Sequence, residues 1–155
     1  MRRLSHVVLA SALACGYTGM ASGNTTLDLG DKAARGYALW TCAVLSRLAE
    51  KDNPTALPYF NAGYDLLKEV VLGIIEGQLT EEEARKVPVG INWSLGGGPS
   101  VDFRLGVIWA DIQNYQYDET FPEISDATFD ERKAIQVTMA ENTFRSSNCP
   151  LLILP

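Results

Sequence analysis

The chain has 155 residues, with 13 basic and 19 acidic side chains, a formal charge of −6 and an isoelectric point near 4.7. This acidic balance argues against nucleic acid and anionic membrane surfaces as partners, and it permits a basic protein partner. The length fits one domain that can bury a core of its own. Net negative charge also keeps a secreted protein soluble, so the charge alone does not establish a partner.

The first 23 residues have the layout of a cleaved signal peptide. Two arginines precede an apolar run at 7–14, and small residues follow. The run is far shorter than the roughly 20 residues that a membrane-spanning helix needs. Cleavage after Gly23 predicts a soluble periplasmic or secreted protein with one helical domain at 24–155. Cleavage before Cys15 is the alternative, and it would give a lipoprotein.

Removal of residues 1–23 deletes two of the 13 basic residues and none of the 19 acids, so the formal charge becomes −8. It also removes His6, the only histidine, which excludes Ser-His-Asp and Cys-His nucleophiles and histidine-based metal sites. We therefore predict a non-enzymatic protein with no catalytic residue, no metal and no cofactor. Carboxylate pairs remain the one common acid–base option.

Two cysteines, Cys42 and Cys149, remain after this removal. An even pair in an oxidising compartment predicts a disulfide, and two buried free thiols are the alternative. Closing a loop of about 107 residues stabilises a fold by about 4.7 kcal/mol in the chain-entropy model. The bridge would fix the C-terminal tail to the core.

The stretch 37–45 carries no charge, whereas charged residues flank it on both sides. A helix that is apolar on both faces needs neighbours on both faces. We therefore predict a central helix at 32–51, with Asp31 as its N-cap and with Trp40 and Cys42 on opposite faces. Later helices should pack around it.

The next predicted helix begins near Asn53-Pro54 and ends at Gly77. One apolar stripe at helical spacing supports it, formed by Leu57, Phe60, Tyr64, Leu67, Val71 and Ile74. Thr80 and Glu83 match a capping box, so a short third helix starts there and ends before Pro88. Residues 88–95 fit either a helical turn or an extended link.

Ser100 is a good N-cap for a fourth helix, whose apolar stripe is Val101, Leu105, Ile108, Ile112 and Tyr115. Residues 116–127 are polar and contain a proline, which predicts a loop. Thr128 and Glu131 form a second capping box and open a fifth helix that runs to about residue 145. The apolar tail 149–155 should pack on the domain. The predicted fold is all-α, with about five helices around a central N-terminal helix.

Four glycines fall inside the predicted helices: Gly36, Gly63, Gly73 and Gly106. Each lowers helix stability by roughly 1 kcal/mol relative to alanine, which favours close helix–helix approaches as the reason for their presence. A functional cleft lined by bare backbone is the alternative.

Aromatic and acidic residues near the two longest predicted loops are the candidate partner contacts. Interface hot spots favour tryptophan and tyrosine, and rim charges steer association. The glycine-rich turn before Ser100 has neither P-loop nor Rossmann spacing, so a structural or partner-contact role is favoured over anion binding. Trp109 is assigned to the core. The candidate contacts are Trp93, Gly97, Gly98, Pro99, Tyr117, Asp118 and Glu119.

Several short motifs occur together: a helix carrying Cys42, Val87-Pro-Val-Gly90, Gly98-Pro-Ser-Val-Asp-Phe103 with Leu-Gly close behind, and Ser147-Asn-Cys149. This layout resembles a group of small secreted helical proteins of Gram-negative bacteria and their prophages. The resemblance implies a periplasmic setting. It implies no activity and assigns no catalytic residue.

Three functional hypotheses follow from the sequence. The first is a periplasmic protein that binds and neutralises another protein, such as an immunity or inhibitor protein against an envelope-targeting toxin or lytic enzyme. The second is a small-ligand carrier with a cavity between its helices. The third is a hydrolase that uses two carboxylates. The oligomeric state stays open.

Overall fold

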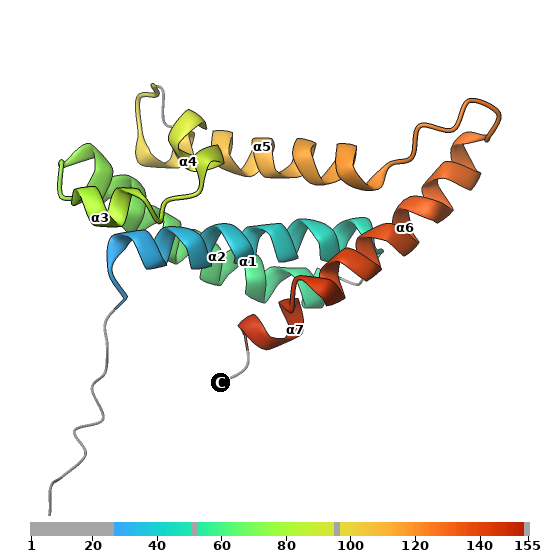
Figure 1. Ribbon diagram of the computed structural model, residues 1–155, viewed down its shortest axis with the longest axis horizontal. Coiled ribbons are helices and arrows are strands. Elements are labelled where there is room, and N and C mark those ends of the chain that lie inside the picture. Colours follow the sequence, from blue (N-terminus) through green and yellow to red (C-terminus); the bar gives the residue numbers. More distant parts are fainter. Residues whose placement is uncertain (1–26, 51–52, 95–96, 154–155) are drawn as a thin grey trace, which may run out of the picture.

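The computed structural model describes residues 27–50, 53–94 and 97–153. The predicted signal peptide, the alternative cleavage site before Cys15 and Gly96 lie outside these ranges. The described chain forms seven helices and confirms the predicted all-α fold (Figure 1): α1 Leu29–Leu48, α2 Asn53–Ile75, α3 Glu81–Ala84, α4 Val89–Ser94, α5 Val101–Thr120, α6 Phe129–Ser146 and α7 Cys149–Leu152.

Helix α1 is the centre of the fold, as its uncharged middle predicts. It contacts α2, α3, α5, α6 and α7, with α5 along one side and α6 and α7 on the other (Figure 1). Trp40 and Val44 belong to a core cluster shared with α2 and α5. Cys42 and Leu45 belong to a second cluster shared with α6 and α7. The two apolar faces of α1 therefore contribute to two core clusters, and Leu48, Phe60 and Trp109 pack against both of them.

Helix α1 begins three residues earlier than predicted. Asp28, rather than Asp31, is its N-cap, because the Asp28 side chain accepts a hydrogen bond from Asp31 N at 2.8 Å. The helix also ends earlier, at Leu48, and Glu50 follows in the left-handed region with φ 55°.

Helix α3 is held against the start of α1 by shared polar contacts. Glu83 completes the predicted capping box with Thr80 and also accepts a hydrogen bond from Leu29 N at 3.1 Å. Lys86 contacts the carboxylates of Asp28 at 2.7 Å and Asp31 at 3.1 Å. These hydrogen bonds raise the pKa of Lys86 to about 12.

Three of the four glycines sit where α1 and α2 approach closely. A methyl group at Gly63 would lie 2.5 Å from Trp40 Cδ1, and one at Gly36 would lie 2.7 Å from Leu67 Cγ. At Gly73 it would lie 2.6 Å from Leu29 Cδ1. The close-approach interpretation is confirmed at these three positions.

The predicted disulfide is present. Cys42 and Cys149 are bonded with their Cα atoms 5.6 Å apart, and both are buried. Tyr59 donates a hydrogen bond to Cys149 O at 3.0 Å, so α2 also holds the tail. The tail forms α7, a short helix. It is one reason why the described chain has seven helices rather than the expected five. The other is α4, which makes Val89–Ser94 helical, one of the two interpretations left open for this segment.

The predicted loop at 116–127 is wrong for its first five residues, because α5 continues to Thr120. Its buried stripe continues through two polar side chains, Gln116 and Thr120, while Tyr115 is exposed. Thr120 Oγ1 donates to Gln116 O at 2.6 Å and accepts from Gln136 Nε2 of α6 at 3.5 Å. This buried polar contact completes the last turn of α5.

Candidate functional site: an open groove along α5

One face of α5 faces α1 and α2, and three adjoining hollows lie between these helices. We call this surface the α5 groove. Its α5 side is formed by Asp102, Gly106, Trp109, Gln113 and Tyr117, which recur at helical spacing. From Asp102 to Tyr117 the groove follows α5 for about 22 Å, at about 1.5 Å per residue.

The first hollow lies between α2 and α5 and has a volume of about 160 Å³. Four of its seven lining residues are aromatic: Trp40, Phe60, Tyr64 and Trp109. The Phe60 ring centroid is 4.9 Å from that of Trp109 and 5.7 Å from that of Trp40, and Tyr64 follows at 6.4 Å from Phe60. We call this hollow the aromatic pit.

Asp102 and Gly106 complete the aromatic pit from the α5 side. Tyr64 donates its hydroxyl hydrogen to Asp102 Oδ1 at 2.7 Å, and this contact raises the pKa of Tyr64. A methyl group at Gly106 would meet no atom within 4 Å. The close-approach interpretation is therefore wrong at Gly106, and bare backbone lines an open hollow instead.

The second hollow continues from the pit and has a volume of about 340 Å³. Phe60 and Trp109 belong to both hollows, which makes them continuous. Leu57 lies exposed at its α2 side, and Arg47 of α1 lies at its far end. Trp109 is half-buried, so it contributes to the core as predicted and also to the groove.

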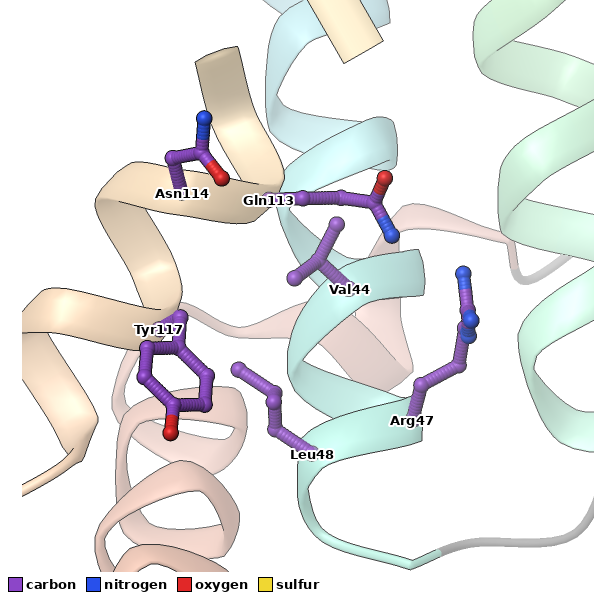
Figure 2. Close-up of a pocket in the computed structure, with 6 residues that line it drawn as sticks. All are labelled: Val44, Arg47, Leu48, Gln113, Asn114 and Tyr117. Atoms are coloured by element: carbon purple, nitrogen blue, oxygen red, sulfur yellow. The ribbon is translucent and has the colours of Figure 1, made fainter. Parts of the chain in front are cut away.

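The third hollow has a volume of about 360 Å³ and lies between α1 and the C-terminal half of α5. Figure 2 shows Gln113 reaching from α5 toward α1 and Arg47 extending beside it, with Tyr117 on the α5 side. Within the described ranges, Arg47 takes part in none of the ion pairs. This end of the groove therefore offers hydrogen-bonding groups beside an apolar surface of Val44 and Leu48.

The C-terminal half of α5, the following loop and the start of α6 carry a block of negative charge. Residues 105–131 contain no lysine, arginine or histidine. They contain seven acids, all exposed: Asp111, Asp118, Glu119, Glu123, Asp126, Asp130 and Glu131. Exposed aromatic residues accompany them, among them Tyr117, Tyr115 and Phe129, which is 60% exposed. We call residues 105–131 the acidic arm.

The predicted contact residues fall into two groups at opposite ends of α5. Trp93 on α4 is 81% exposed, and Gly97, Gly98 and Pro99 precede the first turn of α5. The other group, Tyr117 with Asp118 and Glu119, lies on the last turns of α5 rather than in a loop. The two groups do not form one patch, and only Tyr117 lines the groove.

Sequence reasoning missed most of the groove. The sequence predicts Phe60 and Tyr64 as members of an ordinary apolar stripe, and it does not single out Arg47 as a contact residue. Gly106 was the residue of the sequence that could have indicated the groove, because a glycine inside an amphipathic helix lowers its stability and is therefore unexpected there. The predicted boundary between a helix and a loop at residue 116 divides the acidic arm, so it was not recognised from the sequence as one surface.

Two other open hollows lie outside the groove. One, between the loop and α6, has Asp126 and Glu131 in its lining. Thr128 N–H and hydroxyl donate to Glu131 and lower its pKa. The other lies between α1, α2 and α7 and has Leu39, Leu66 and Leu152 in its lining.

In the described part of the chain, no cluster of histidine, cysteine and carboxylate side chains has the composition of a metal site. None of the described helices combines the length and apolar character that crossing a bilayer requires. A scan against protein-family models found no match, and searches of curated proteins and of solved structures found none either. The resemblance to small secreted helical proteins therefore stays a prediction.

Proposed function

We propose that this chain is a non-enzymatic periplasmic protein that binds and neutralises a basic protein, such as an envelope-targeting toxin or a lytic enzyme. The observation that carries the proposal is the α5 groove. It is elongated and open, with an aromatic floor at one end and polar groups at the other. Surfaces of this kind accept a helical or extended segment of a partner.

The groove contains the residue types that dominate binding energy at protein interfaces. Hot spots are enriched in tryptophan, tyrosine and arginine near the centre of the contact. Trp109, Tyr117 and Arg47 line the groove, and each is positioned by a helix of the core rather than by a loop. A partner segment would therefore meet a surface that is already formed.

The acidic arm supports a basic partner. Its seven exposed acids lie on α5 and just beyond, beside the end of the groove that Tyr117 lines. Complementary charge speeds diffusional encounter by roughly 10- to 1000-fold, and added salt weakens this effect. The arm would steer the partner, and the groove would hold it.

The geometry favours protein binding over the two alternatives. A carrier site surrounds most of a small ligand, whereas the three hollows of the groove are open along one side. Carboxylate-based hydrolysis needs one acid whose pKa is raised. Of the pair Asp126 and Glu131, Glu131 is held ionised by its capping contacts, with a lowered pKa.

The test starts with affinity capture from a periplasmic extract at low salt and continues with the purified partner. Tyr117→Ala should speed dissociation, whereas Asp118→Lys with Glu119→Lys should slow association and flatten its salt dependence. Leu151→Ala is the matched control, because Leu151 is an exposed apolar residue on α7, away from the groove.

A retained protein whose binding is unchanged both by Tyr117→Ala and by the two lysine substitutions would overturn the proposal. Trp93→Ala then has a separate use. A loss of affinity in this variant would extend the contact from the groove to α4.

A further inference from the structure

We propose that the aromatic pit accepts a cationic side chain, lysine or arginine, from the bound polypeptide. This assignment rests on the proposed function and adds a specificity pocket to it. The pit combines three features that suit such a side chain: a ring-lined hollow, a carboxylate at its edge and free space above a glycine.

The rings suit the aliphatic part and the charge of a cationic side chain. Aromatic faces attract a nearby ammonium or guanidinium group through their quadrupole, with tryptophan the strongest. Phe60, Tyr64 and Trp109 are half-buried, so each keeps part of its ring accessible from the groove. The chain itself shows the attraction, because Lys68 Nζ lies 5.6 Å from the centroid of the Tyr64 ring.

Asp102 supplies the charge complement. Its side chain is exposed and its Oδ1 accepts the hydrogen bond from Tyr64, which fixes the carboxylate beside the rings. Among the described residues, no hydrogen-bond or ion-pair partner contacts its Oδ2, which is therefore available to a cation. Asp102 also lies in the first turn of α5, where a carboxylate stabilises the helix end. The test must therefore separate binding from helix stability.

Gly106 makes room for the side chain. A methyl group there would meet no atom within 4 Å, and the hollow of about 160 Å³ is close to the roughly 150 Å³ that admits a benzene-sized group. The helix would be more stable with alanine at this position. A larger side chain at position 106 would fill this open space.

The direct test uses small probes and needs no partner. The probes are the N-acetyl methylamides of lysine, arginine and norleucine, the last an uncharged analogue of lysine. The readout is the indole N–H signal of Trp109 in a nuclear magnetic resonance titration. Trp93, which is 81% exposed and outside the pit, is the internal reference.

We expect the lysine and arginine probes to shift the Trp109 signal saturably while the norleucine probe and the Trp93 signal show no such change. Asp102→Asn keeps an acceptor for Tyr64 and removes the charge, so it should weaken probe binding by up to about five-fold, the upper range for an exposed ion pair. Gly106→Leu should abolish it, whereas Gly106→Ala should retain it. A melting curve for each variant shows whether the fold is intact.

Equal shifts with norleucine, or no Trp109 shift with any probe, would overturn the assignment. The same holds if Gly106→Leu folds and binds the cationic probes like the wild type. If the probes fail while partner binding still depends on Tyr117, the pit assignment is lost and the proposed function stands. If the probes bind but no partner depends on the groove, the proposed function is lost instead.

Discussion

The α1–α2 interface and the α5 face that opposes it use the same residue in opposite ways. Between α1 and α2, Gly63 lies against Trp40, and a methyl group there would be 2.5 Å from the indole. On α5, Gly106 borders the aromatic pit, and a methyl group there would meet nothing within 4 Å. One glycine closes an interface, and the other leaves a surface open.

This difference separates a glycine that tight packing requires from a glycine that packing does not require. At the closed interface, every atom added must displace a neighbour, so packing explains the glycine. At the open face, packing does not require Gly106, and alanine at this position would make α5 more stable. Gly106 therefore weakens α5 without a packing reason, at a position where a larger side chain would extend into the aromatic pit.

The largest expected effect comes from removing the side chain at the centre of the closed interface. Trp40 is 1% exposed, and its Nε1 donates to Phe60 O at 2.9 Å. Trp40→Ala should lower the free energy of unfolding by about 3–5 kcal/mol, because it removes a large buried ring and leaves a cavity. Chemical denaturation measures this, with the exposed Trp93→Ala as the control. Equal stability of the two variants would show that α1 is not the centre of the fold.

Loss of the disulfide should be the next largest effect. Replacing Cys42 and Cys149 together by serine should cost about 2–5 kcal/mol, because the bridge restrains the unfolded chain over a separation of 107 residues. Mass spectrometry of freshly purified, unreduced protein checks the bond itself. Two thiols that react with an alkylating agent would contradict its presence.

The two glycines should respond to alanine with opposite signs. Gly63→Ala should destabilise by about 1–3 kcal/mol, because the new methyl group overpacks against Trp40. Gly106→Ala should stabilise by about 0.4–1 kcal/mol, because alanine restricts the unfolded chain and meets no neighbour. Denaturation curves of the two variants and the wild type give the change in the free energy of unfolding for each substitution. Changes of the same sign would erase the distinction between the two faces.

The smallest effect concerns acid pH. Hydrogen bonds from Thr80 lower the pKa of Glu83 below its ordinary 4.5, so the unfolded chain binds its proton first as the pH falls. This contribution is present above about pH 4.5 and disappears as the pH falls through the lower folded value. Glu83→Gln should therefore flatten the decline of the melting temperature with acid. An unchanged slope would argue against this contribution.

The all-α fold, the central helix and the cysteine pair were predictable because each depends on a local pattern. Capping boxes at Thr80 and Thr128 place helix starts without tertiary information, and both are present. The end of α5 was not predictable, because its buried residues Gln116 and Thr120 are polar and have the composition of a loop. Their burial depends on a contact with α6 that no local pattern encodes.

The groove was beyond sequence reasoning for a similar reason. Its walls are formed by α1, α2 and α5, and the sequence of each helix shows only the apolar pattern of an ordinary core helix. Whether Phe60 and Trp109 are covered or exposed depends on how far α5 stands from α2. Among the predicted contacts, Tyr117 lines the groove, whereas Trp93 lies on α4 at the other end of α5.

Side-chain footprinting of the captured complex shows directly whether the partner occupies the α5 groove. Hydroxyl-radical labelling reports the solvent access of aromatic and aliphatic residues on every face of the protein at once. We expect the partner to protect Leu57, Trp109 and Tyr117, while Leu151 on α7 stays as reactive as in the free protein. Protection of Leu151 or of Trp93, with the three groove residues still reactive, would contradict this expectation.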